Sequence, residues 1–190
     1  MIIINTKKEL EKKSLFSEYQ ILRETSEENY EFIDGNIIKM YSPTTNHQDV
    51  VLNLAMQLKQ FFENGKCKVM ISPYDIYLEK EDIDKEICVI PDISIMCNKD
   101  GFTEKRYHGV PTIIIEVLST NWADDMIKKL KLYEEFGVQE YWIIDPNSKA
   151  FMLYSYDVEK KSYSHTQQND YELCSELFPD LKINMSIVFS

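Results

Sequence analysis

Two short apolar segments, each carrying a single carboxylate, stand out in the hydrophobic pattern of the chain. They span residues 91–96 and 113–118, and their β-branched residues predict two buried strands. Asp92 lies in the first segment and Glu116 in the second. An ionised carboxylate that leaves water needs a cation, a set of hydrogen-bond donors or a metal ion as compensation. The pattern therefore suggests that Asp92 and Glu116 share one metal ion.

Residues 30–40 predict a β-hairpin. Asp34 and Gly35 lie between two runs with apolar residues, and this dipeptide favours a two-residue turn, which requires positive φ. Glu31 and Asp34 are both candidate functional acids. The turn by itself accounts for Asp34.

A helix is predicted after the hairpin. Thr45 and Gln48 fit a capping box, and apolar residues then recur at helical spacing until Asn64-Gly65 ends the pattern. His47 precedes Val51 by four residues, which places it on the buried face in the first turn. A histidine here is more often a capping or partly buried structural residue, and a position at the mouth of a site would favour a functional role.

The remaining pattern completes the predicted fold. The further elements are a strand over 68–79 with a bulge or edge position at Ser72-Pro73, a strand over 87–97, a helix from Asp124 or Asp125 to Gly137, a buried strand from Tyr141, and a peripheral β-meander from Phe151 with short pieces near Leu173 and Ile187. This order predicts an α+β fold with a central mixed sheet flanked by helices, an N-terminal hairpin and a C-terminal β-meander. We expect an N-terminal arm over residues 1–28 and a single domain over residues 29–190.

The charge and composition narrow the possible functions. The chain has 190 residues, with 21 Lys and Arg against 32 Asp and Glu, so its formal net charge is −11. This charge counts against non-specific nucleic-acid binding, although a local basic patch or a divalent metal can act inside an acidic protein. No apolar run approaches the roughly 20 residues of a membrane helix. The N-terminal residues do not resemble a secretory signal, so we expect a cytoplasmic protein that makes no membrane contact.

The four cysteines do not form a metal-binding pattern. Cys67, Cys88, Cys97 and Cys174 include no Cys-x-x-Cys pair and lie near no histidine cluster. A zinc site is therefore disfavoured. We expect reduced and mostly buried thiols.

Three lysines follow Glu116 on the predicted helix. At about 100° per residue, the apolar face is centred near Leu130, and Lys128 and Lys131 fall on the opposite side. Lys129 alone falls on the flank of the apolar face and should point toward the sheet. Either its stem covers apolar surface while its ammonium reaches water, or it is a cation held near the two strand acids. The two otherwise uncompensated acids favour the second interpretation.

Two carboxylates and a lysine suit metal-assisted hydrolysis of phosphodiesters. Asp92 and Glu116 would bind Mg²⁺, or alternatively Mn²⁺, because hard cations prefer carboxylates, carbonyls and waters. The backbone carbonyl of Val117 is a candidate further ligand. Such a metal lowers the pKa of a bound water and stabilises charge on the phosphate. Lys129 would orient the nucleophile and offset charge in the transition state.

With these residues identified, the sequence resembles the Uma2 family, also called DUF820, whose members are predicted to belong to the PD-(D/E)xK nuclease superfamily. The resemblance covers roughly residues 30–157 and extends to Leu177-Phe178-Pro179. The matching segments, in order, are 32–37, the helix with His47, 91–94, 115–119, 129–133 and 141–146. Their combined order and spacing are more specific than any one of them.

The resemblance implies a role for each candidate residue. Asp92 matches the first acid of the superfamily pattern and Glu116 the second, whereas Leu118 occupies the usual lysine position. In this family the lysine is implied to lie on the following helix, where Lys129 matches it, and His47 matches a position near the site. The chain departs from the family at residues 119–121, which lack a proline and are one residue shorter, so Lys128 stays an alternative. The resemblance also implies a restriction-endonuclease-like core and a homodimer.

Three functional hypotheses follow. The first is a Mg²⁺-dependent endonuclease that hydrolyses DNA, with Asp92, Glu116, Lys129 and His47 as its catalytic candidates. The second is a non-catalytic protein of the same fold that binds a protein or a nucleic acid, and the acidic charge favours a protein partner. The third is a metal-dependent hydrolase that acts on another phosphate ester.

Overall fold

The computed structural model describes residues 15–119, 123–166, 168 and 171–190. The helices are α1 (Phe16–Thr25), α2 (Thr45–Phe62), α3 (Ala123–Phe136) and α4 (Met185–Val188). The strands are β1 (Tyr30–Ile33), β2 (Asn36–Lys39), β3 (Lys68–Ile71), β4 (Asp75–Tyr77), β5 (Cys88–Val89), β6 (Ile93–Met96), β7 (Arg106–His108), β8 (Ile113–Val117), β9 (Glu140–Asp145), β10 (Ala150–Asp157), β11 (Ser162–Thr166), β12 (Glu172–Cys174) and β13 (Lys182–Asn184). None of the described helices is long and apolar enough to span a membrane.

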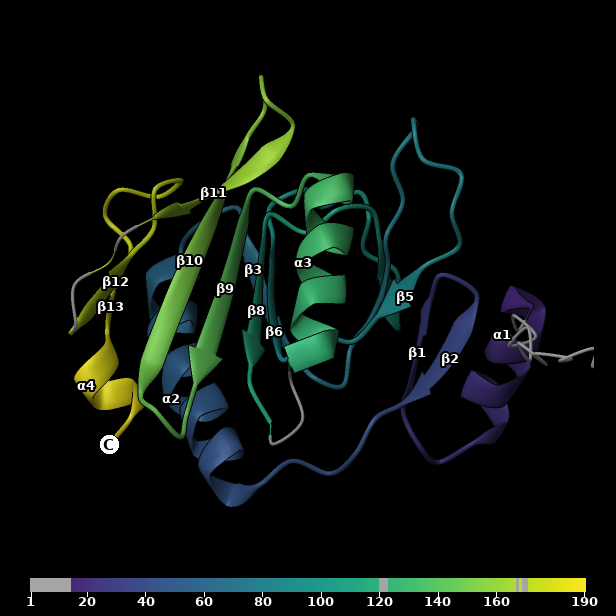
Figure 1. Cartoon of the computed structure of the whole chain (residues 1–190), viewed down its shortest axis with the longest axis horizontal. Coiled ribbons are helices and arrows are strands. Elements are labelled where there is room, and N and C mark those ends of the chain that lie inside the picture. Colours follow the sequence, from purple (N-terminus) through teal and green to yellow (C-terminus); the bar gives the residue numbers. More distant parts are fainter. Residues whose placement is uncertain (1–14, 120–122, 167, 169–170) are drawn as a thin grey trace, which may run out of the picture.

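A six-stranded mixed sheet forms the centre of the molecule (Figure 1). Its strand order is β11-β10-β9-β8-β6-β3, in which β8 and β9 run parallel and the other neighbours run antiparallel. The predicted α+β fold with a central mixed sheet is therefore confirmed. The strand predicted from Tyr141 is β9, and the meander predicted from Phe151 begins with β10 and β11, which form one edge of this sheet.

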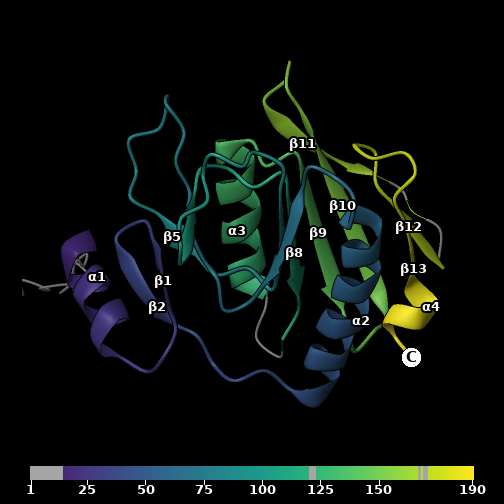
Figure 2. The ribbon, with the colours of Figure 1, turned by 180° about the vertical axis from the view of Figure 1, so that it is seen from behind.

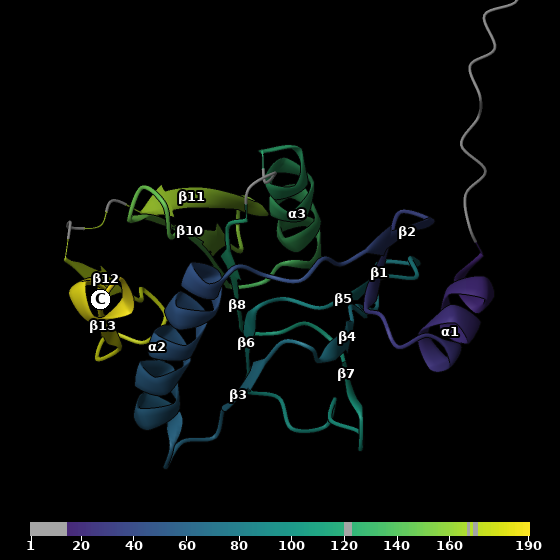
Figure 3. The same ribbon diagram turned by 90° about the horizontal axis from the view of Figure 1, so that it is seen from below.

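Two helices cover opposite faces of this sheet. Figure 3 shows α2 on one side and α3 on the other, and Figure 2 shows the face that α2 covers. Successive residues of β8 face the two helices in turn. Ile113 and Ile115 pack in the core with α2, whereas Ile114 packs in the core with α3. Glu116 follows this alternation. It lies on the same side of the strand as Ile114 and faces α3.

The start of α2 differs slightly from its prediction. The N-cap is Thr44, whose side chain accepts a hydrogen bond from the His47 backbone N–H at 3.3 Å. The predicted box between Thr45 and Gln48 was therefore placed one residue too late. The helix still buries His47 in its first turn, as the apolar spacing predicted.

A second sheet of five strands lies beside the first, with the order β2-β1-β5-β4-β7. The predicted hairpin is confirmed as β1 and β2, and both turn residues have positive φ, 50° at Asp34 and 73° at Gly35. Helix α1 packs on this sheet through Tyr19, whose hydroxyl donates to the Tyr30 carbonyl at 3.1 Å. Residues 1–14 of the predicted N-terminal arm lie outside the described part of the chain.

Three predicted strands differ from the structure: two of them each divide into two strands, and the third is helical. Residues 68–79 form β3 and β4 in different sheets, with a cis Ser72–Pro73 bond between them, and proline cannot donate to a strand ladder. Residues 87–97 likewise divide into β5 and β6, so Asp92 lies just before β6 rather than inside a strand. The piece near Ile187 belongs to α4, which begins after Asn184 caps the Ser186 backbone N–H.

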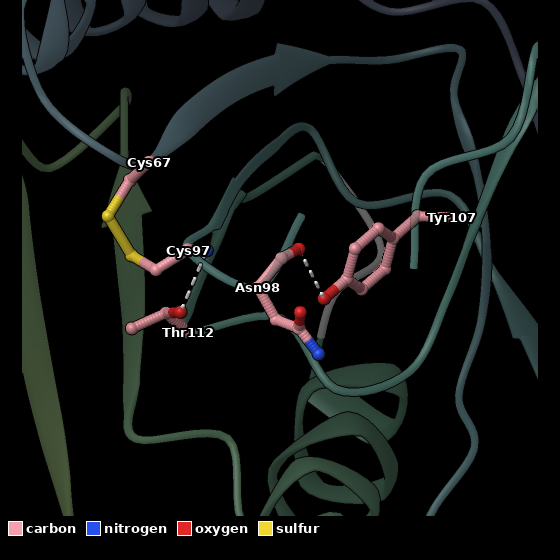
Figure 4. Close-up of a disulfide and its surroundings, with 5 residues drawn as sticks. All are labelled: Cys67, Cys97, Asn98, Tyr107 and Thr112. Carbon is pink, nitrogen blue, oxygen red and sulfur yellow. Dashed lines mark hydrogen bonds between the residues drawn. A yellow bond between two sulfur atoms is a disulfide. The ribbon is translucent and has the colours of Figure 1, made fainter. Parts of the chain in front are cut away.

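The prediction that the cysteines are reduced is wrong for one pair. Cys67 and Cys97 form a disulfide (Figure 4). Cys67 precedes β3 and Cys97 follows β6, and these strands pair antiparallel with Lys68 opposite Met96, so the two cysteines come together at the strand ends. Their separation of 30 residues in the sequence gives no sign of this pairing. Cys88 and Cys174 are free thiols, and Cys88 is buried.

Candidate active site

The pairing of β6 with β8 brings Asp92 to the strand that carries Glu116. Ile93 lies opposite Ile115 in this antiparallel pair, so Asp92, which precedes Ile93, reaches the end of β8. There its Oδ2 accepts a hydrogen bond from the Val117 backbone N–H at 2.8 Å. The two acids predicted from separate segments therefore come from neighbouring positions at one end of the central sheet.

His47 reaches the same carboxylate from the first turn of α2. Its Nε2 lies 3.3 Å from Asp92 Oδ2, and the His47 side chain is 8% exposed. Its Nδ1 is buried and has no hydrogen-bond partner among the described residues. Asp92 is thus held from two directions, by the backbone of β8 and by the imidazole of α2.

Glu116 projects from the face of β8 that α3 covers. Its Oε1 accepts hydrogen bonds from the Lys129 ammonium at 2.9 Å and from the Tyr133 hydroxyl at 3.0 Å. Lys129 and Tyr133 are four residues apart, so they lie on the same side of the helix. The Glu116 side chain is only 12% exposed.

The lysines of α3 divide as their helical positions predicted. Lys129 is buried at 7% exposure, whereas Lys128 and Lys131 are exposed. The shorter connection before α3, which made Lys128 an alternative, includes residues 120–122 outside the described part of the chain. The contact with Glu116 nevertheless belongs to Lys129.

Glu31 joins this group from the five-stranded sheet. Its Oε1 accepts hydrogen bonds from the Lys129 ammonium at 3.2 Å and from the Ile90 backbone N–H at 2.9 Å. The sequence left Glu31 only as a candidate acid. The informative signal is the one that identified Asp92 and Glu116, namely a single acid in an otherwise apolar strand, here β1 with Phe32 and Ile33. Tyr133 gave no comparable signal, because a tyrosine on an apolar helix face is ordinary core.

Burial has the largest effect on the pKa of Glu116, and the charge of Lys129 has the next largest. Burial raises its pKa, the Lys129 charge lowers it, and the charges of Asp92 and Glu31 raise it again, so that it reaches about 7. Burial and the charges of Glu116 and Glu31 also raise the pKa of Tyr133 well above its ordinary value, which keeps this hydroxyl a donor.

The pKa of His47 is raised by its neighbours. Burial lowers it, but the hydrogen bond to Asp92 and the charges of Asp92 and Glu116 outweigh burial. The raised pKa favours a protonated imidazole beside Asp92, which would then be a donor to that carboxylate.

The donor set fits a hard divalent cation. Three carboxylates interact here, Asp92, Glu116 and Glu31, while Lys129 supplies a single buried ammonium. Mg²⁺ is commonly held by one or two carboxylates together with waters, rather than by a closed cage of side chains. Among the described residues, no group of three or more His, Cys, Asp or Glu is placed so that it could hold a metal ion.

Comparison with known proteins places the chain in a family. A family model named Uma2, described as "Putative restriction endonuclease", matches residues 16–186. The chain belongs to the Uma2 family. The resemblance read from the sequence is therefore confirmed, and the match extends beyond residues 30–157 at both ends.

Two relatives and a solved structure are also similar to this chain. Two uncharacterized proteins of Synechocystis sp. are similar: sll1609 is 29% identical over 68% of this chain and 73% of its own length, and slr1290 is 25% identical over 72% and 71%. A crystal structure from Anabaena variabilis, described as "a putative nuclease belonging to DUF820", superposes with a TM-score of 0.68. It is 17% identical and covers 86% of this chain and 91% of its own, so this Uma2 protein has the fold of that structure.

Proposed function

We propose that this Uma2 protein is a metal-dependent nuclease that hydrolyses phosphodiester bonds of DNA. The observation that carries the proposal is the convergence of Asp92, Glu116 and Lys129 at one end of the central sheet. The descriptions of its family and of its structural neighbour as putative nucleases support the same class of reaction.

Each residue has a defined task in the proposed reaction. Asp92 and Glu116 would hold Mg²⁺ or Mn²⁺, and the Val117 carbonyl is a candidate third ligand. When bound, the metal supplies a water of lowered pKa and positive charge beside the phosphate. Lys129 places its ammonium next to Glu116, where it offsets negative charge that develops on the phosphate.

The surrounding groups hold these side chains in place. His47 acts through Asp92 and is a positioning residue, since the imidazole and the Val117 N–H together fix one carboxylate oxygen. Tyr133 plays the same part for Glu116 by donating to its Oε1. A site built from a strand end, a strand and two helices is more rigid than one built on loops, which favours accurate placement of the reacting groups.

The acidic charge of the chain bears on how the substrate binds. With a net charge of −11, the protein as a whole repels nucleic acid. A bound divalent cation would offset part of this repulsion at the site itself. We therefore expect DNA affinity to depend more strongly on the metal than is usual for basic nucleases.

Plasmid cleavage tests the proposed function. Purified protein is incubated with supercoiled DNA and Mg²⁺ or Mn²⁺, and conversion to nicked or linear forms is followed over time. Asp92→Asn should abolish cleavage, whereas Glu140→Gln, which removes a buried carboxylate at the far end of the sheet, should retain it. Equal rates for wild type and Asp92→Asn would assign the cleavage to a contaminant and contradict the proposal.

Plasmid cleavage, together with assays of metal binding and of small phosphodiesters, separates the alternatives. Absence of cleavage, together with absence of metal binding that depends on Asp92 and Glu116, would favour a non-catalytic binding module, for which the acidic charge suggests a protein partner. Cleavage of small phosphodiesters but not of DNA would favour a different phosphate ester as substrate.

We further propose a homodimer in the cytoplasm. Light scattering would then give twice the chain mass of 22.5 kDa.

A further inference from the structure

We propose that Glu31 is a positioning residue that fixes the Lys129 ammonium in the site, an inference that rests on the proposed function. Glu31 comes from β1, in the five-stranded sheet, whereas Asp92, Glu116 and Lys129 belong to the central sheet and its helix α3. The residue thus connects the hairpin sheet to the candidate active site.

The burial of Glu31 points to a specific role. The residue is 3% exposed and lies between Tyr30 and Phe32 in an apolar strand. A carboxylate is costly to bury unless it is paired and hydrogen-bonded. Lys129, at 7% exposure, is an equally buried group of opposite charge, and the two side chains meet at 3.2 Å.

One oxygen of Glu31 binds both the backbone beside Asp92 and the lysine. Its Oε1 accepts the Ile90 N–H at 2.9 Å and the Lys129 ammonium at 3.2 Å. Ile90 lies two residues before Asp92, in the segment that leads from β5 to β6. Through Glu31, the Lys129 ammonium is therefore linked to the backbone segment that carries Asp92.

Two acceptors define the position of the ammonium better than one. Lysine has a flexible four-carbon stem and three equivalent donors, so a single carboxylate leaves a wide range of positions open to it. Here Glu116 holds the nitrogen at 2.9 Å and Glu31 holds it from a second direction. Glu116 is also a proposed metal ligand, whereas the task that we propose for Glu31 is confined to the lysine.

A purely structural ion pair would behave differently on substitution. It would affect folding but would change the rate constant for cleavage only as far as it changed the amount of folded protein. A positioning residue lowers kcat while leaving the KM for DNA unchanged. Its effect also disappears when the group that it positions is absent.

Glu31→Gln is the test variant. The amide oxygen of glutamine can still accept the Ile90 N–H, but the charge that attracts the ammonium is lost. The matched control is Glu140→Gln, which removes another carboxylate of similar burial that contacts neither Lys129 nor Glu116. If Glu31→Gln fails to fold by circular dichroism, Glu31→Asp, which keeps the charge one methylene short of its partners, takes its place.

The first readout is nuclear magnetic resonance of the lysine ammonium groups in metal-free protein labelled with ¹⁵N-lysine. The Lys129 signal, assigned by its loss in Lys129→Gln, should be protected from water exchange in wild type and in Glu140→Gln. It should broaden or vanish in Glu31→Gln. An unchanged signal in Glu31→Gln, or no protected Lys129 signal in wild type, would overturn the proposal.

The second readout is steady-state cleavage of plasmid DNA with Mn²⁺, with the DNA in excess over the protein. Glu31→Gln should lower kcat about tenfold with KM unchanged, since small misplacements of a reacting group have effects of this size or larger. In a Lys129→Gln background the same change should have no further effect. Independent, multiplying losses would overturn the proposal. If wild type cleaves no DNA, the proposed function fails, while the magnetic resonance result still decides the role of Glu31.

Discussion

Glu116, which is partly buried, and Glu140, which is fully buried, lie at opposite ends of one parallel strand pair. In the register of β8 with β9, Glu116 lies opposite Ile143 and Glu140 lies opposite Ile113. Glu140 accepts hydrogen bonds from Trp142 Nε1, Ser175 Oγ and the backbone N–H groups of Glu176 and Leu177, at 2.7 to 2.9 Å. Glu116 is instead bound by one ammonium and one phenol, among other carboxylates.

The difference separates a structural acid from a candidate functional one. Burial raises the pKa of Glu140, and its many neutral donors oppose the rise. These donors satisfy the carboxylate completely and tie the segment at 175–177 to β9. Around Glu116 the neighbouring acids add to the effect of burial, so excess negative charge accumulates that a cation can neutralise. Burial alone therefore does not single out a candidate site, whereas burial among like charges makes Glu116 a candidate.

The largest expected effect is on catalysis. Glu116→Gln should reduce the initial rate of plasmid cleavage by at least about 10³-fold, because it removes a metal ligand and its charge. Glu140→Gln should leave the rate per folded molecule within about threefold, since its side chain contacts no residue of the site. Initial rates corrected for folded fraction by circular dichroism measure both. A comparable loss in the two variants would remove the distinction between the two glutamates.

The next effect concerns the lysine beside Glu116. Lys129→Gln should lower the cleavage rate about 10²-fold, which is typical for loss of one donor that stabilises charge in the transition state. Lys128→Gln, one residue away and exposed, is the matched control and should retain the wild-type rate. The same plasmid assay measures both variants. A larger loss in Lys128→Gln would shift the site lysine by one residue and contradict the assignment.

For stability we expect the opposite ranking, with a larger loss in Glu140→Gln than in Glu116→Gln. Glu140→Gln should lower the free energy of unfolding by about 2 kcal/mol, because a neutral amide cannot accept all the donors that surround the carboxylate. Glu116→Gln should leave it within about 0.5 kcal/mol at neutral pH, since the loss of an ion pair is offset by relief from like charges. Urea unfolding in EDTA measures both. A larger loss for Glu116→Gln would mean that Glu116 is primarily structural.

The last effect is a pH dependence. The folded pKa of Glu116, about 7, lies above its ordinary value of 4.5, so between these values the folded state binds the extra proton. The contribution of this group to stability is therefore greatest below pH 4.5 and decreases as the pH rises to 7, by at most about 1.4 kcal/mol per pH unit. Measured in EDTA, wild type should lose stability over this range relative to Glu116→Gln. Parallel curves for the two proteins would contradict the raised pKa.

The sequence predicts the candidate residues that the structure brings together, because local patterns encode their positions. An acid in each of two β-branched segments identifies Asp92 and Glu116, and helical spacing separates Lys129 from Lys128 and Lys131 without any tertiary information. The fold class follows from the same patterns. These patterns assign each residue correctly to a face of its own helix or strand.

Features that depend on long-range contacts were not predictable in this way. Glu31 reaches Lys129 across 98 residues of sequence, and Glu140 reaches its backbone donors across 36 and 37. The disulfide between Cys67 and Cys97 depends on the register of β3 with β6. A single sequence does not contain that register explicitly, since strand pairing is set by how the whole core packs.

The central claim is that Glu116, and not Glu140, belongs to a site for a divalent cation. Titration calorimetry of Mn²⁺ into metal-free protein tests it most directly, because it requires neither DNA nor turnover. The account predicts one ion bound per chain by wild type and by Glu140→Gln, and binding weakened at least about tenfold in Glu116→Gln. Equal Mn²⁺ binding by wild type and Glu116→Gln would contradict it.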